Sequence, residues 1–238
     1  MRKMLLVLVL PFTMSLCGDS AVPIKKDPPK PTVAADTVEA VVRVDMGGRY
    51  RGPGVTVTST GYVVTALSNL SEYEFWKYRV TVGSDRIPGK IVAVDETRGL
   101  ALIRAERPLQ KWVIFSSRAD FETGEAAVVV SYADSGNDPP MIERRQVPEF
   151  LTGIHERGES AGKIDLRDMM SVSAGNGAEK LHVNGAAAFT PNPDRFIGIV
   201  IGWAASGYGS NIAAPLMVVP ESSVVAFMKA HHAIPKTQ

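Results

Sequence analysis

The chain has 238 residues, of which 45% are hydrophobic and 21% are charged, with 26 basic and 25 acidic side chains. This composition suits a globular protein with one large core or two small ones. The near-neutral charge gives no basis for general nucleic-acid binding, and the single cysteine excludes an internal disulfide.

The first 17 residues have the pattern of a bacterial signal peptide. Arg2 and Lys3 precede an apolar run over residues 4–12 that is too short to span a bilayer. We therefore expect export to the periplasm or cell envelope. Cys17 directly after this run resembles a lipobox cysteine, although Leu16 stands where Gly, Ala or Ser is usual. Two products stay open: a lipoprotein anchored through Cys17, or a soluble protein cut after Cys17 or Ser20.

Residues 18–36 predict a tether. Pro23, Pro28, Pro29 and Pro31 lie among lysines without apolar periodicity, and proline favours extended backbone.

From Thr37 onwards, short apolar runs alternate with turn residues, which indicates an all-β chain. Residues 37–107 predict one antiparallel barrel, because closing the sheet removes its exposed edges. Its strands are expected at residues 38–45, 54–59, 62–67, 75–82, 87–94 and 100–105.

Residues 108–238 predict a second barrel and a C-terminal helix. The helix should begin after Pro220 and end near His231, with Val224, Val225, Phe227 and Met228 as its apolar side chains. The strands are expected at residues 112–115, 125–132, 141–155, 163–172, 186–190, 195–203 and 211–218.

Two motifs resemble trypsin-like serine proteases of the HtrA/Deg type. GYVVTALSNL at residues 61–70 is similar to the family's GYVVTNNHVV, and DETRGLALI at residues 95–103 is similar to its DxxxDLALI. FETGE at 121–125, LTGI at 151–154 and the G-P-G of residues 52–54 follow the same order. The resemblance covers residues 37–231 and implies two antiparallel six-stranded β-barrels with a C-terminal helix. No PDZ domain and no internal repeat are found.

The resemblance assigns the catalytic positions to three side chains. Ser68 stands at the family's histidine, Gly99 at its aspartate, and Asn184 at its nucleophilic serine, with Gly185 following and His182 at the first oxyanion residue. An alternative register uses residues 174–178 and places Gly177 at the nucleophile. Neither register supplies a serine.

Each catalytic role fails chemically at these positions. An amide is not a nucleophile, a hydroxyl is not a base near neutral pH, and glycine has no side chain to orient a base. His182 also replaces a glycine whose backbone freedom shapes the oxyanion loop. We therefore predict a catalytically inactive homologue.

The histidines leave one enzymatic alternative open. A contact between Ser68 and His182 across the cleft would create a rearranged serine endopeptidase site. His155 on a hairpin tip, and His231 and His232 at a helix end, are interpreted as surface residues. Asp95 and Glu96 are expected to face solvent.

No metal-ligand spacing and no cofactor motif is found. The aromatic residues Tyr73, Phe75, Trp76 and Tyr78 predict either core packing or a binding patch.

In the resembling family, substrate adds as a strand beside the segment matched here by residues 200–204. Such binding needs only backbone hydrogen bonds and a pocket. We predict a polypeptide or protein partner, and Phe189 or Trp203 plugging the cleft would argue against this. A purely structural envelope lipoprotein is the other alternative, and the oligomeric state is left open. The predicted binding residues are His182, Gly185, Val200, Ile201, Gly202 and Trp203.

Overall fold

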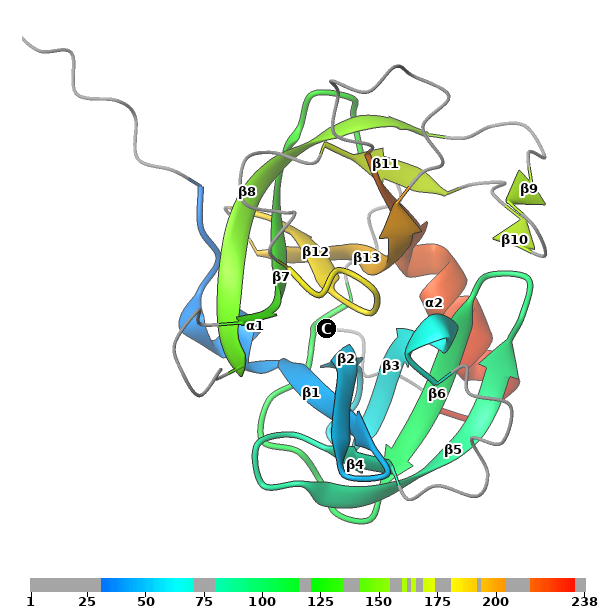
Figure 1. The fold of residues 1–238 in the computed structure, drawn as a ribbon. Helices are drawn as coiled ribbons and strands as arrows, with labels where there is room; N and C mark the ends of the chain where they lie inside the picture. The colour runs from blue at the N-terminus through cyan, green and yellow to red at the C-terminus, as the bar shows by residue number, and fades with distance from the viewer. Residues whose placement is uncertain are drawn as a thin grey trace, which may run out of the picture.

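The protein folds into two β-barrels that pack side by side (Figure 1). The description rests on a computed structural model. It covers residues 31–70, 80–115, 121–134, 142–154, 160–161, 164–165, 169–173, 181–191, 194–203 and 215–233.

The first barrel is closed by six antiparallel strands in the order β1-β2-β3-β6-β5-β4. The short 3-10 helix η1 (Leu67–Leu70) follows β3. The strands are β1 (Val41–Met46), β2 (Arg49–Thr56), β3 (Tyr62–Ala66), β4 (Val80–Val82), β5 (Ile87–Asp95) and β6 (Leu100–Ala105).

The second barrel is closed in the order β11-β14-β13-β12-β7-β8. Its strands are β7 (Ala126–Asp134), β8 (Ile142–Ile154), β11 (Met170–Val172), β12 (Ala187–Thr190), β13 (Arg195–Trp203) and β14 (Leu216–Pro220). The connection from β8 to β11 carries a two-stranded sheet of β9 (Ser160–Ala161) and β10 (Ile164–Asp165). The prediction of two six-stranded antiparallel barrels is confirmed.

Three apolar clusters hold the molecule together: one inside each barrel and one between the two barrels. Strand β6 is buried on both of its faces. Leu100 and Leu102 pack between the barrels, whereas Ala101 and Ile103 point into the first barrel, because successive side chains alternate across a strand. The two barrels therefore share a core.

The predicted C-terminal helix is present as α2 (Glu221–Ala230), and it packs on this shared core. Val224, Phe227 and Met228 are buried at the spacing of one helix face. His231 and His232 follow the helix and are exposed, and the His231 ring lies 5.2 Å from the Phe227 ring.

Two expected elements are wrong. Residues 35–39 form a short helix, α1 (Ala35–Glu39), and Val33 before it is 6% exposed, so the end of the expected tether packs on the barrels. Residues 112–115 do not form a strand. Val113 and Phe115 are buried and Trp112 and Ile114 are exposed, as in a strand. The segment makes only isolated bonds of the strand type: the N–H of Val113 donates to the carbonyl of Thr56 in β2, and Phe115 forms a single bridge.

Strand bounds also shift in the connection between β8 and β11. The strand expected at 163–172 enters the barrel only over β11, while residues 164–165 belong to the separate sheet. Several expectations lie outside the described residues: the leader with Cys17, residues 18–30, the aromatic residues 73–78, His155 and the alternative register at 174–178. No helix in the described part of the chain is long and apolar enough to cross a membrane.

Candidate functional site

Ser68 and Gly99 are positioned by neighbouring strands of the first barrel. β3 pairs with β6, and η1 continues from β3 at the point where Gly99 precedes β6. The backbone N–H of Leu67 donates a 2.7 Å hydrogen bond to the carbonyl of Gly99. The residue before Ser68 is thereby fixed against Gly99.

Asn184 and Gly185 form a turn of the second barrel that reaches the first barrel. The N–H of Gly185 donates to the carbonyl of Val200 at 2.6 Å, which ties the turn to β13. The side-chain amide of Asn69, next to Ser68, donates to the carbonyl of Asn184 at 2.7 Å. The positions of Ser68, Gly99 and Asn184 therefore meet in one region between the barrels.

Asn69 is a site residue that the sequence interpretation missed. It is 7% exposed, and its Nδ2 also lies 2.9 Å from the hydroxyl of Thr65 and 3.2 Å from the carbonyl of Pro53. One amide thus links β2, β3 and the Asn184 turn. Its only signal in the sequence is a polar residue at the end of the apolar run 61–70, which does not identify its partners.

Gly185 is required at its position by a close approach of backbone. Its φ is +87°, a left-handed conformation that glycine adopts most easily. A Cβ atom there would overlap the carbonyl oxygen of Pro53 and lie 2.6 Å from the Thr65 hydroxyl. The glycine therefore allows the two barrels to touch at the candidate site.

Aliphatic side chains surround the position of Gly99. A Cβ atom on Gly99 would lie 3.4 Å from Cδ1 of Ile164 and 3.8 Å from Cδ1 of Ile201. Ile164 is held there because the N–H of Asp165 donates to the carbonyl of Thr97 at 2.8 Å. A carboxylate at this position would face apolar groups, which disfavour its charged form.

Asp95 organises the turn before Gly99, so the expectation that it faces solvent is wrong. Its Oδ1 accepts hydrogen bonds from the N–H and the hydroxyl of Thr97, at 3.0 and 2.6 Å, and from the N–H of Arg98 at 3.0 Å. Burial alone would raise the pKa of Asp95. The hydrogen bonds from Thr97 and Arg98 and the Arg98 charge outweigh it and lower that pKa below its ordinary value. Glu96 beside it is exposed, as expected.

His182, which precedes the Asn184 turn, belongs to a cluster of aromatic and basic side chains from several strands. Its ring lies edge-on to that of Tyr50, with centroids 5.1 Å apart. The Tyr50 ring lies 6.0 Å from that of Tyr132, and the Arg43 guanidinium lies 5.4 Å from the Tyr50 centroid. Asp45 accepts two hydrogen bonds from Arg43, and these raise the pKa of Arg43 above its ordinary value. The His182 ring therefore packs against β2 of the first barrel.

β13 offers a backbone edge next to Asn184. Its residues Gly198 to Trp203 pair with β14, and on the other side the N–H of Val200 donates to the carbonyl of Ala186. Beyond Val200, no described residue pairs with that second edge. A Cβ on Gly202 would lie 3.7 Å from Oδ1 of Asn184, which places the amide beside this edge.

Phe189 does not plug the cleft. It is 1% exposed and packs in the core between the barrels, with its ring centroid 5.8 Å from that of Phe196. The side chain of Trp203 lies outside the described residues. Among the described residues, no group of three or more His, Cys, Asp or Glu side chains is placed to hold a metal ion.

No family model and no curated protein matches this chain. Solved structures do match. The Rv3671c protease from M. tuberculosis, in its active form, has a TM-score of 0.64 at 16% identity, over 98% of this chain and 97% of that chain. The MamO protease domain from Magnetospirillum magneticum has a TM-score of 0.58 at 20% identity, over 81% and 97%. The HtrA-type protease AlgW has a TM-score of 0.62 at 13% identity, over 84% and 66%.

The chain has the fold of the trypsin-like serine proteases. In this fold the site between the barrels is where the sequence resemblance places Ser68, Gly99 and Asn184. The side chains found there are a hydroxyl, a hydrogen and an amide, and the Gly99 position is surrounded by isoleucines. A hydroxyl and an amide at these positions can exchange hydrogen bonds with a bound chain.

Proposed function

We propose that this chain is an exported, catalytically inactive protein of trypsin-like fold that binds an extended segment of a polypeptide partner. The segment adds as a strand to the edge of β13 at residues 201–203. The observation that carries the proposal is this edge, which no described residue pairs beyond Val200 and which lies beside Asn184.

Strand addition suits a site without catalytic groups. Its affinity comes from main-chain hydrogen bonds, which need no base, nucleophile or metal. The Asn184 amide beside Gly202 can donate a hydrogen bond to a passing peptide and cannot attack it. The isoleucine side chains near Gly99 can contribute apolar contacts to a bound peptide, but they cannot accept or donate a proton.

Export is supported by the sequence. Arg2, Lys3 and the apolar residues 4–12 predict a leader, and Cys17 offers a site for lipidation. Metabolic labelling with an alkyne fatty acid tests the anchor: labelling that disappears in Cys17→Ala supports a lipoprotein. An unlabelled protein in the soluble envelope fraction supports the soluble product.

Binding is tested with an array of 15-residue peptides and the full-length chain, followed by fluorescence anisotropy of the peptides that bind. Asn184 is half-buried, and its contact with Asn69 uses the backbone carbonyl, so Asn184→Trp fills the edge without removing that contact. We expect Asn184→Trp to weaken binding by at least about tenfold. Val92→Trp, on a 45% exposed residue of β5, is the matched control and should bind normally.

The alternatives give different results. If no peptide binds, or if both tryptophan variants bind as the parent does, the proposal is wrong and a structural envelope lipoprotein is favoured. A rearranged endopeptidase would cleave the array peptides and lose that activity in Ser68→Ala or His182→Ala.

A further inference from the structure

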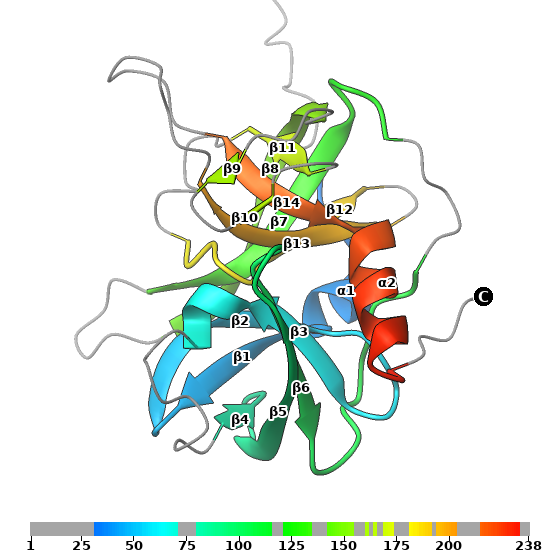
Figure 2. The ribbon, with the colours of Figure 1, turned by 90° about the vertical axis from the view of Figure 1, so that its right-hand side faces the viewer.

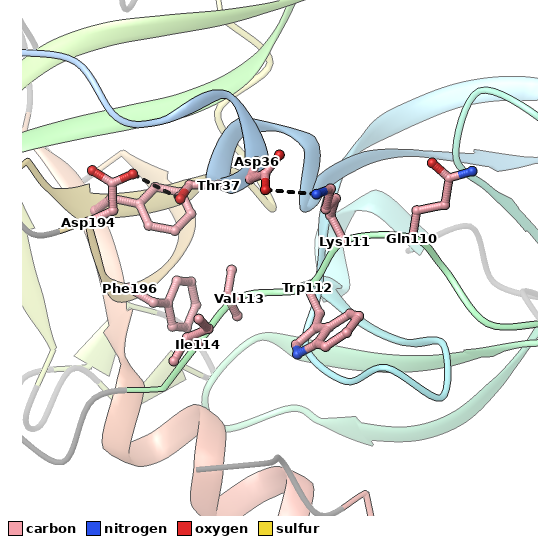
Figure 3. A pocket seen from close by; sticks show the side chains of 10 residues that line it. Asp36, Thr37, Gln110, Lys111, Trp112, Val113, Ile114, Asp194 and Phe196 are labelled. Carbon is pink, nitrogen blue, oxygen red and sulfur yellow. Dashed lines mark hydrogen bonds and ion pairs between the residues drawn. The ribbon is translucent and has the colours of Figure 1, made fainter. Parts of the chain in front are cut away.

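A cavity lies away from the β13 edge. It measures about 430 Å³ and is enclosed by α1, the connector residues 110–114 and the β12–β13 hairpin (Figure 3). Figures 1 and 2 show α1 and η1 on different sides of the molecule. The cavity is therefore separate from the site that contains Ser68.

The floor of this cavity is apolar and partly exposed. Among the described residues, four large hydrophobic side chains are exposed, and two of them, Trp112 at 37% and Ile114 at 49%, line this one cavity. The buried rings of Phe189 and Phe196 lie beneath. Neighbouring apolar side chains left in water favour a partner that covers them.

One wall of the cavity carries a fixed carboxylate. Oδ2 of Asp194 accepts hydrogen bonds from the N–H of Ala34 at 2.6 Å and from the hydroxyl of Thr37 at 2.9 Å. These bonds hold the half-buried side chain against α1, and Figure 3 shows the one to Thr37. Its other oxygen, Oδ1, receives no hydrogen bond from a described residue.

The remaining charges of the cavity compensate each other. Nζ of Lys111 lies 2.7 Å from Oδ2 of Asp36 across the rim, and that hydrogen bond raises the pKa of Lys111 above its ordinary value. Because this pair is neutral as a whole, Asp194 contributes the only uncompensated charge among the described residues that line the cavity. The cavity thus carries one net negative charge above an apolar floor.

We propose that this cavity binds the side chain of a lysine or arginine from a polypeptide partner. The cationic end pairs with Oδ1 of Asp194, and the methylene stem lies across Trp112 and Ile114. Lysine and arginine side chains fit both the carboxylate and the apolar floor, because their methylene stems cover apolar surface while their terminal groups stay charged. An aromatic ring beside the cation strengthens the contact. The proposal does not depend on strand addition at β13.

The experiment uses nuclear magnetic resonance on the full-length, ¹⁵N-labelled chain. The chain has three tryptophans, so it gives three indole N–H signals, and Trp112→Phe identifies the one from Trp112. The probes are the blocked peptides Ala-Gly-Lys-Pro-Gly-Ala and Ala-Gly-Arg-Pro-Gly-Ala, with a norleucine counterpart that keeps the stem and lacks the charge. We expect the basic peptides to shift the Trp112 signal in a saturable way.

Three variants separate charge from packing. Asp194→Asn keeps an acceptor for α1 and removes the charge, so it should weaken binding of the basic peptides about tenfold and leave the norleucine peptide unchanged. Ile114→Ser should weaken all three peptides. Asp85→Asn, at an exposed carboxylate outside the cavity, is the control and should have no effect.

Several results would overturn the proposal. These are the absence of a saturable shift, equal affinity for the norleucine and basic peptides, and unchanged affinity in Asp194→Asn. A Trp112 signal that moves with protein concentration in the absence of peptide would show that a second copy of the chain fills the cavity instead.

Discussion

The side-chain amide of Asn69 in the first barrel donates a 2.7 Å hydrogen bond to the backbone carbonyl of Asn184 in the second. The two residues are 115 positions apart in the chain. This bond joins the segment that carries Ser68 to the turn that stands at the nucleophile position. Its loss should loosen the candidate site and the contact between the barrels together.

Asn69→Ala should lower the free energy of unfolding by about 1–3 kcal/mol, because it removes the donor to the carbonyl of Asn184 and to the buried hydroxyl of Thr65. Urea unfolding measures this. Asn184→Ala is the matched control, since the acceptor is a backbone carbonyl that the substitution keeps, and its cost should stay below about 0.5 kcal/mol. Equal costs for the two variants would show that the amide does not join the barrels.

Gly52→Ala should be destabilising through a clash with one identified side chain. A Cβ atom on Gly52 would overlap the amide group of Asn69. We expect a cost of about 2 kcal/mol in the parent chain and a clearly smaller one in an Asn69→Ala background, which removes the clashing atoms. A double-mutant cycle by urea unfolding measures the difference. Strictly additive costs would contradict the predicted contact.

The charge of Asp95 should stabilise the fold only above acidic pH. Its pKa in the folded protein lies below the unfolded value of about 3.9, so its contribution is complete above that value and is lost as pH falls through the folded pKa. Asp95→Asn keeps the acceptor and removes the charge. Its stability deficit should be full near pH 6 and shrink below about pH 4, in urea titrations at several pH values.

The control for Asp95 is Asp85→Asn, since the Asp85 side chain is 71% exposed and its pair with Arg107 is exposed as well. This variant should differ little from the parent at any pH. A deficit in Asp95→Asn that stays constant down to pH 3 would assign the effect to shape and not to charge.

Restoring the three catalytic side chains should not restore hydrolysis. In the triple variant Ser68→His, Gly99→Asp, Asn184→Ser, the aspartate would adopt the left-handed φ of +66° and face Ile164 and Ile201. The strain and the apolar surroundings disfavour an ionised carboxylate that could orient the histidine. We expect turnover of a fluorogenic peptide mixture at the level of the parent chain.

Adding Ile164→Ala to the triple variant tests the reason for that result, because it opens the space next to residue 99. If the quadruple variant is active and the triple variant is not, Ile164 is what prevents a working aspartate at residue 99. Activity already present in the triple variant would mean that the site keeps a working geometry around its changed residues.

The sequence predicts what local patterns determine, which here is the order of both barrels and the C-terminal helix. It fails where packing decides. Residues 112–115 alternate between buried and exposed as a strand does, yet among the described residues their contact with β2 is one backbone hydrogen bond, from Val113 to Thr56, and not a ladder. Short α1 lies in a segment whose prolines suggest a tether, and it is held by Asp194, more than 150 residues away.

In the candidate site, too, local sequence patterns predict some features and long-range packing decides the others. The positions of Ser68, Gly99 and Asn184 follow from motifs, and the structure brings them into one region. Neither the three contacts of the Asn69 amide nor the isoleucine that faces Gly99 has a local signature, because each depends on segments brought together by closure of the two barrels.

Catalytic inactivity is tested most directly by a search for new peptide termini with mass spectrometry. The full-length chain is incubated for a day with denatured casein and with the peptides that bind to it. We expect the bound peptides and the casein to stay intact. New termini that appear with the parent chain and disappear in Ser68→Ala or His182→Ala would contradict this expectation.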